Sequence, residues 1–257
     1  MQEKVPVLRE QKPRKTGSRK LRFFLFLLFT VLLAVLFFRS SISKVSQIDI
    51  TGNVFLPREE IGQAAGVAIG ESYFTVRPSS VEERIRQLRA VRSVSVTKSF
   101  PGVVRIEVEE HPLVAYQFSA SGEKEAVLAN GQTFPAADAK KVMDKPVLAG
   151  WDDADPWKTK LCETLAQIPD KLLAEISEIR PSPTTTYEDK IKMYTRSQFE
   201  VYTTVTYLPD KIQYLEEMIL QMREKEIESG VFELLEVNTH IPFELYYGSQ
   251  VLKKTTQ

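Results

Sequence analysis

The sequence predicts an α+β protein with one N-terminal transmembrane helix, a small β-α-α-β-β domain and a second, strand-rich α/β domain. Three observations predict this fold class. Residues 23–38 form one apolar run without charge, residues 43–113 place two helical patterns between strand patterns, and residues 114–247 contain several short β-rich segments. The 257 residues suffice for one membrane segment and one or two domains of about 100–150 residues.

The formal net charge of zero combines a basic N-terminus with an acidic remainder. Residues 1–22 hold eight Lys and Arg and two Glu (+6), so 26 of the 34 basic and 32 of the 34 acidic residues follow them (−6). Nucleic-acid binding requires a clustered basic surface that displaces counterions from phosphates, so we expect no nucleic-acid partner. The single cysteine, Cys162, cannot form an intramolecular disulfide, and the fold must be stabilised by burial.

The apolar run over residues 23–38 determines the predicted compartment. At about 1.5 Å per residue it covers roughly 24 Å, and an extension to residue 42 allows it to cross a hydrocarbon layer of about 30 Å. The basic residues before it predict a cytoplasmic tail over 1–22, a transmembrane helix over 23–42 and extracytoplasmic domains. A cleaved signal peptide is the alternative. Phe37, Phe38 and Arg39 stand where cleavage requires small residues, so we favour a single-pass anchor in the inner membrane.

Residues 43–113 have the pattern of one compact domain. We expect, in chain order, a strand over residues 45–51, a helix over 57–66, a helix over about 78–90 and a hairpin over 94–108. Gly66 can end the first helix, and Ser79 or Ser80 can cap the second. A turn at Phe100-Pro101-Gly102 separates the alternating apolar residues of the hairpin.

Two segments of this domain resemble a known family. The entry VSQIDITGNVFLPREEI (residues 45–61) and the exit VRSVSVTKSFPGVVRIEVEEHPLVAYQF (residues 91–118) are similar to the POTRA domain of the FtsQ/DivIB family of bacterial cell-division proteins. One departure is His111-Pro112-Leu113-Val114-Ala115, where the family more often has Arg-x-Pro-Val-Ala. The resemblance is specific over 45–115 and extends by pattern to about residue 247.

Residues 114–247 are expected to form the second domain. Asn130-Gly131 predicts a hairpin with a two-residue turn, and Asp155 followed by Pro156 predicts a capped helix to about residue 168. A long amphipathic helix is expected over residues 209–228, ended by Gly230. The remaining elements are expected strands over 114–118, 126–129, 132–134, 146–149, 176–180, 190–194, 199–202, 232–237 and 241–247. We expect residues 248–257 to be a short disordered tail.

The resemblance implies a scaffold and not an enzyme. Members bind FtsL-type and DivIC/FtsB-type partners outside the membrane and help to assemble or stabilise the septal peptidoglycan synthesis complex, which adds the septal transpeptidase and an FtsW-type glycosyltransferase as possible partners. It also implies concentration at the division septum. In the family the C-terminal strand is an edge that partners extend by β-augmentation.

We therefore expect partner binding at the terminal strand and the final helix. The candidate residues are Leu235, Val237, Phe243, Leu245, Tyr246, Tyr247 and Arg223. Core packing of one of the two tyrosines is the alternative reading, and charge substitutions at both are expected to abolish binding of the DivIC-type partner. A membrane-proximal POTRA surface of Arg84, Arg86 and Arg89 is a further candidate, with an ordinary solvated face as its alternative.

We expect no catalytic centre, cofactor or metal. His111 and His240 lack nearby ligands, Cys162 has the pattern of a buried helix residue, and Asp152, Asp153 and Asp155 fit a helix start better than a cation loop. Two other classes remain as alternatives: a POTRA-containing transport or assembly receptor, which would normally carry several POTRA copies, and a membrane-stalked hydrolase, which would need a nucleophile and base or a metal cluster.

Overall fold

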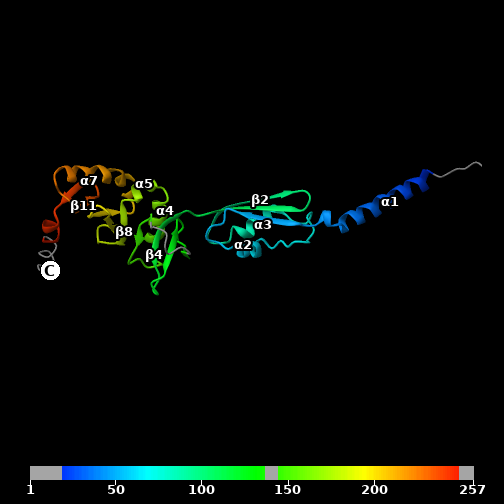
Figure 1. The fold of residues 1–257 in the computed structure, drawn as a ribbon, viewed down its shortest axis with the longest axis horizontal. Helices are drawn as coiled ribbons and strands as arrows, with labels where there is room; N and C mark the ends of the chain where they lie inside the picture. The colour runs from blue at the N-terminus through cyan, green and yellow to red at the C-terminus, as the bar shows by residue number, and fades with distance from the viewer. Residues whose placement is uncertain (1–18, 137–143, 249–257) are drawn as a thin grey trace, which may run out of the picture.

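The computed structural model describes residues 19–136 and 144–248, so most of the predicted tails over 1–22 and 248–257 lie outside the described residues. Figure 1 shows the described elements following one long axis in chain order. A single helix lies at one end, a three-stranded sheet in the middle and a nine-stranded sheet at the other end. This arrangement confirms the predicted α+β fold class.

Helix α1 (Arg19–Arg39) is the N-terminal apolar helix, and its length and composition suffice to cross a membrane. Its 21 residues span about 32 Å, and none of them is buried against the rest of the protein. The helix ends three residues earlier than the predicted limit of 42. Ser40 accepts a hydrogen bond from the backbone N–H of Ile42 at 3.4 Å, and this contact starts the short 3₁₀ turn η1 (Ser41–Ser43).

The first sheet has the predicted β-α-α-β-β order. Its strands are β1 (Gln47–Thr51), β2 (Val91–Ser99) and β3 (Val103–Glu110), and its helices are α2 (Arg58–Ala65) and α3 (Pro78–Ile85). Strand β3 is central, parallel to β1 and antiparallel to β2. The alternating valines and isoleucines of the strands pack against Ile61, Val81 and Ile85 of the two helices, which closes one hydrophobic core.

Helix α3 differs from its prediction at both ends. It begins after Arg77, with Pro78 in the first turn and no side-chain cap, so neither Ser79 nor Ser80 caps it. It ends at Ile85, although Leu88 continues the apolar repeat and is partly buried. Tight turns from Ile85 to Val91 keep Leu88 facing the core, so the repeat did not reveal where the helix stops.

The second sheet begins directly after the first. Its nine strands within the described residues are β4 (Leu113–Phe118), β5 (Lys124–Leu128), β6 (Thr133–Pro135), β7 (Val147–Leu148), β8 (Ile176–Pro181), β9 (Lys190–Thr195), β10 (Phe199–Thr204), β11 (Gly230–Leu234) and β12 (Asn238–Ile241). Their spatial order is β12-β11-β10-β9-β8-β7-β4-β5-β6. Strand β12 therefore forms one edge of this sheet and β6 the other.

Helices cover one face of the second sheet. They are α4 (Pro156–Leu165), α5 (Asp170–Leu173), α6 (Leu208–Lys211), the 3₁₀ turn η2 (Ile212–Tyr214) and α7 (Leu215–Glu224). Inward residues of the strands, such as Ile191 and Phe232, share one core with Leu161 and Leu215 of the helices. Asp155 caps α4 as predicted, because its carboxylate accepts a hydrogen bond from the N–H of Trp157 at 2.8 Å.

The two sheets pack against each other where β5 and β6 meet the end of the first domain. The rings of Phe55 and Phe134 lie 6.2 Å apart, and Leu128 of β5 belongs to the core of the first sheet. The Asn130 amide donates to the carbonyl of Arg89 at 2.7 Å. The Asn130-Gly131 hairpin is present, but its loop has three residues, because Leu128 pairs with Gln132 and only Gly131 has a positive φ.

The predicted helix over 209–228 is interrupted and shorter. The turn η2 separates α6 from α7, and α7 ends at Glu224. Glu226, with φ 59°, closes the helix: its own N–H bonds to Arg223, and the next N–H bonds to Met222. Gly230 therefore starts β11 and does not end the helix.

The C-terminal prediction is also corrected. The expected strand over residues 241–247 is absent: β12 occupies Asn238–Ile241, and residues 243–248 are helical. Backbone N–H groups of Leu245 and Tyr246 bond to the carbonyl of Pro242, which opens this short helical segment.

Candidate partner-binding site

The terminal strand β12 presents an open edge of the second sheet. It pairs with β11 in an antiparallel register from Val231↔Ile241 to Leu234↔Asn238. No strand pairs with its other side within the described residues, and the side chains of Asn238 and Thr239 are exposed. Unpaired N–H and C=O groups along such an edge can hydrogen-bond an added strand from another chain.

The structure separates the predicted binding residues from this edge. Leu235 and Val237 lie in the turn between β11 and β12, where Val237 is largely exposed. Phe243, Leu245, Tyr246 and Tyr247 lie in the helical segment 243–248, so their expected location on the edge strand is wrong. The two groups flank β12 on either side along the chain.

The two tyrosines of the C-terminal segment have different surroundings. Tyr246 is 7% exposed, and its ring lies 5.2 Å from that of Tyr202 on β10, whereas Tyr247 is 39% exposed. Tyr246, Tyr202 and Val231 form a small core on the sheet face opposite the helices. Tyr246 therefore packs the segment onto the sheet, and the exposed Leu245 beside it faces outward.

A largely buried ion pair holds the same segment. Lys192 of β9 and Glu200 of β10 are 16% and 15% exposed, and their charged atoms lie 2.9 Å apart. Tyr247 donates its hydroxyl proton to Glu200 and accepts a hydrogen bond from Lys192 at 3.1 Å. Burial opposes the charge of Lys192, but its contacts with Tyr194, Glu200 and Tyr247 outweigh burial and raise the pKa of its ammonium group.

Tyrosine rings complete this face of the sheet around Lys192. Its ammonium nitrogen lies 4.6 Å from the ring centre of Tyr194 and 5.5 Å from that of Tyr202, within the range of cation–π attraction. Burial raises the pKa of the Tyr202 hydroxyl to about 12, so this group stays neutral at physiological pH. The C-terminal segment thus rests on an aromatic surface that also carries the Lys192–Glu200 ion pair and the ammonium group of Lys190, which lies 5.1 Å from the ring centre of Tyr202.

His240 anchors β12 on the helix-covered face. Its ring lies 5.5 Å from that of Phe232, and its buried Nε2 has no hydrogen-bond partner among the described residues. A side chain on Gly230 would approach this nitrogen to 2.3 Å, so the glycine makes room for the imidazole. Burial lowers the pKa of His240 from its ordinary value of 6.5; a hydrogen bond to the backbone of Ser229 opposes this shift, and the charge of Lys225 adds to it.

We predict that β12 loosens when the pH falls below about 6.5. The neutral imidazole is favoured in the folded state, so its stabilising effect is complete above the unfolded pKa of 6.5 and is lost as the pH falls through the lowered folded pKa. Amide exchange over residues 230–241, corrected for the intrinsic rate at each pH, should show weaker protection at pH 5.5 than at pH 7.5.

The control for this prediction is His240→Gln, which places a polar side chain at this position that stays neutral at both pH values. A local measurement is needed because burial and Arg92 also lower the pKa of His111 in the first domain. The variant should lose the pH dependence in β11 and β12. Equal pH dependence in the wild-type protein and the variant would contradict the prediction.

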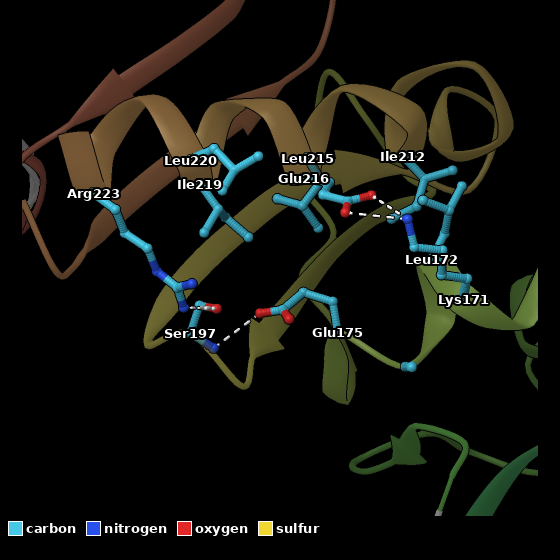
Figure 2. Close-up of a pocket in the computed structure, with 11 residues that line it drawn as sticks. Lys171, Leu172, Glu175, Ser197, Ile212, Leu215, Glu216, Ile219, Leu220 and Arg223 are labelled. Atoms are coloured by element: carbon cyan, nitrogen blue, oxygen red, sulfur yellow. Dashed lines mark hydrogen bonds and ion pairs between the residues drawn. The ribbon is translucent and has the colours of Figure 1, made fainter.

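A groove on the helix-covered side of the sheet contains Arg223, the predicted residue of the final helix. Figure 2 shows it between α7 and the segments around Lys171, Glu175 and Ser197. The groove encloses about 280 Å³ over an apolar floor that includes Leu215 and Ile219. Arg223 donates to the hydroxyl of Ser197 at 2.8 Å, and Lys171 pairs with Glu216 at 3.2 Å, so polar contacts cross both ends.

The three arginines of the first domain do not form one membrane-proximal surface. Arg84 bonds to the carbonyls of Ala64 and Ala65, where it caps the C-terminus of α2. Arg89 lies at the opposite end from α1, because its carbonyl accepts the bond from Asn130 of the second domain. Arg86 is exposed just beyond α3. The expected membrane-proximal position is therefore wrong for Arg89, and Arg84 is engaged within the domain.

The other reactive residue types have structural contacts. Cys162 is fully buried, and burial raises the pKa of its thiol to about 12. Asp152 accepts a bond from the N–H of Ala154, and Asp153 pairs with the buried ammonium of Lys158. Within residues 19–136 and 144–248, no group of three or more His, Cys, Asp and Glu residues is arranged to hold a metal ion.

Sequence reasoning did not select the residues that now define the site. Asn238 and Thr239 lie between two predicted strands, and only the sheet order shows that they form its edge. Lys192 and Glu200 alternate with buried residues along β9 and β10. The sequence pattern therefore indicates that both side chains point to the outer face of the sheet. Their pairing across β9 and β10 depends on a strand register that the sequence does not display.

Comparison with known proteins matches the two sheets separately. A model of the FtsQ-type POTRA domain matches residues 43–111, and a model of the C-terminal region of the cell division protein FtsQ/DivIB matches residues 115–234. The cell division protein DivIB of Paenibacillus polymyxa is 43% identical over 239 residues, which cover 93% of this chain and 92% of that protein. DivIB of Brevibacillus brevis is 32% identical over 250 residues, covering 97% and 92%.

Among solved structures, the major extracytoplasmic domain of DivIB from Geobacillus stearothermophilus is 27% identical, with a TM-score of 0.37. It covers 45% of this chain and 97% of that chain.

Proposed function

We propose that this chain, which belongs to the FtsQ/DivIB family of bacterial cell-division proteins, is a bitopic scaffold of the division machinery. In this proposal α1 anchors the chain in the cell membrane, with a cytoplasmic N-terminus, and both sheets lie outside at the division septum. The second sheet binds FtsL-type and DivIC/FtsB-type proteins. Through them the chain helps to assemble or stabilise the septal peptidoglycan synthesis complex, including its transpeptidase and FtsW-type glycosyltransferase.

One observation carries the proposed binding mode: the open side of β12. Backbone groups of Asn238 to Ile241 supply hydrogen bonds to an added strand, and flanking side chains supply selectivity. Val237 on one flank and Leu245 on the other are exposed apolar residues. The open edge offers backbone pairing to a partner strand, and the exposed apolar residues just before and after it in the chain are the proposed side-chain contacts.

The structure changes which substitutions test this surface. A charge at Tyr246 would enter the core with Tyr202 and Val231 and unseat the whole segment, so lost binding would not identify a contact. Val237→Glu and Leu245→Glu alter exposed side chains and leave that core intact. We predict that each weakens binding of the DivIC-type partner by at least about tenfold, or 1.4 kcal/mol, by placing a charge in an apolar contact.

The matched control is Leu220→Glu, an exposed leucine of α7 beside the groove on the helix-covered side of the sheet. Quantitative co-purification of each variant from membranes, together with unchanged thermal unfolding, separates the two surfaces. Binding lost only in Leu220→Glu would transfer the interface to the groove. Binding equal to that of the wild-type protein in all three variants would contradict both the edge of β12 and the groove as the interface.

Arg86 and Arg223 remain proposed secondary contacts. Arg86 is exposed on the first domain, where it could meet an acidic segment of another division protein, and Arg223 lies at one end of the groove. The backbone of Arg89 lies at the junction of the two sheets, so a partner that contacts its side chain would bind near that junction.

A further inference from the structure

The connection between α1 and the first sheet is short and is held by several hydrogen bonds. Ser43 is buried, and its hydroxyl donates to the carbonyl of Phe38 at 2.7 Å. The N–H of Tyr73 bonds to Ser43 at 2.9 Å, and the N–H of Val45 bonds to Glu71 at 2.8 Å. These contacts tie the end of the helix to the loop before α3. The first sheet is therefore held at a fixed place beside the helix end.

An aromatic contact places the loop before α3 at the level of the last turn of α1. The ring of Phe74 lies 6.0 Å from Phe37 and 5.7 Å from Phe38, which form the last turn of α1. Phe74 is thus level with residues that are themselves part of the apolar helix. A membrane that contains this turn of α1 must reach Phe74 as well.

The tip of the β2–β3 hairpin faces the same way. The ring of Phe100 lies 6.1 Å from Tyr73, and the N–H of Ser46 bonds to the carbonyl of Gly102 at 2.8 Å. Ile42, Phe74 and Phe100 are 51%, 48% and 58% exposed at this end of the sheet. We call these three residues the junction patch.

We propose that the junction patch enters the boundary between lipid headgroups and acyl chains, so the bilayer surface is a docking partner of the first sheet. The inference rests on the proposal that α1 spans the membrane. Exposed phenylalanine and isoleucine side chains gain free energy by leaving water for the acyl chains just below the headgroups. The patch continues the apolar surface of α1, and this continuity identifies lipid as its occupant.

Basic side chains border the patch at the level of the headgroups. Arg39 ends α1, and Lys44 follows two residues after Ile42. The ammonium of Lys98 lies 4.4 Å from the ring centre of Tyr73 and donates to the carbonyl of Val76 at 2.8 Å. Cations in this position attract the phosphates of anionic lipids, while long apolar stems lie along the patch.

The test uses the full-length chain in vesicles of phosphatidylglycerol and phosphatidylethanolamine. Single cysteines are introduced at Phe74, Phe100, Thr30 and Val54 in a Cys162→Ala background and labelled with an environment-sensitive fluorophore. Thr30 lies in the middle of α1, and Val54 is exposed beyond the opposite end of β1. Quenching by lipids that carry a nitroxide at the headgroup or along the acyl chain then reports the depth of each label.

We expect labels at 74 and 100 to be quenched several-fold more than a label at 54, most strongly by the shallow nitroxide. The label at 30 should be quenched most strongly by the deep nitroxide. Labels at 74 and 100 that match 54 while 30 is quenched would overturn the docking of the patch and leave the anchor intact. Absence of quenching at 30 would overturn the anchor and the docking together.

A second variant tests the patch without changing the labelled site. Phe100→Asp places a charge on the exposed hairpin tip and should reduce quenching of the label at 74 several-fold. Val54→Asp makes the same change at the opposite end of the sheet and should leave that quenching unchanged. Equal effects of the two variants would contradict the proposal, because they would show that position 100 has no special contact with lipid.

Discussion

Gly52→Ala should lower the free energy of unfolding of the first domain by about 2–5 kcal/mol, the largest effect that we expect from a single methyl group. Gly52 follows β1 with φ +85°, and a Cβ there would lie 2.0 Å from the carbonyl oxygen of Val108. That oxygen belongs to β3, the central strand of the sheet, which pairs with β1 and β2. The strand cannot move away without breaking one of its two ladders.

Gly70→Ala is the matched control for this prediction. Gly70 also has a positive φ of +94°, but a Cβ there would meet nothing within 4 Å. Its cost should be limited to the backbone strain of about 1–2 kcal/mol. Chemical unfolding of the two variants, followed by amide exchange in β1 and β3, separates strain from collision. Equal losses in both variants would show that β3 moves freely and would contradict the argument.

The first domain was predictable because its signals are local. Valine and isoleucine alternate along β2 and β3, and Gly66 takes the left-handed conformation that ends α2 as expected. Each of these features depends on a few neighbouring residues. The same holds for Asp155 at the start of α4, where a carboxylate and the following proline together determine the helix start.

The C-terminal region was predicted less well because non-local contacts determine it. Leu208, Ile212, Leu215, Ile219 and Met222 stay buried through the break at η2, so the apolar repeat does not reveal the interruption. Glu226 adopts the left-handed conformation that sequence reasoning reserved for Gly230. Aromatic residues over 243–247 favoured a strand. Pro242 followed by Glu244 is a helix-start signal that could have corrected it.

The edge of the sheet could not be predicted from any single segment. Strand β11 contains the last strong apolar run and could be taken for the terminal strand. In the structure, β12 pairs with its outer side. Leu235 and Val237 are candidates as residues of the expected terminal strand over 232–237, and they lie in a turn instead. A sheet edge is a property of strand order, so the sequence alone indicates which segments are strands but not which one remains unpaired.

Glu200→Gln should lower the free energy of unfolding of the second domain by about 2–3 kcal/mol, because it leaves a largely buried ammonium without its carboxylate. Lys192 keeps its tyrosine neighbours, but rings replace only part of the lost ion pair. Lys192→Met should have a similar cost, because it removes the cation facing Glu200. Glu163→Gln, in an ion pair whose two side chains are 60% and 50% exposed, is the control and should cost less than about 0.5 kcal/mol.

The double variant Lys192→Met/Glu200→Gln should recover most of this loss, to within about 1 kcal/mol of the wild-type protein. Neither buried charge of the pair then remains, and the amide oxygen introduced at position 200 can still accept a hydrogen bond from the Tyr247 hydroxyl. Urea unfolding of the two single variants and the double variant gives the coupling free energy. Additive losses would show that Lys192 and Glu200 do not act as a pair.

The same cycle links packing to partner binding. Tyr247 contacts both charged residues, and its segment, which follows β12 in the chain, also carries the exposed Leu245. If the ion pair holds this segment in place, Glu200→Gln should weaken co-purification of the DivIC-type partner although neither β12 nor Leu245 is changed. The double variant should restore it, since no unpaired buried charge then remains beneath the segment. If Leu245→Glu weakens binding of the partner and Glu200→Gln does not, the segment contacts the partner without being held in place by the ion pair.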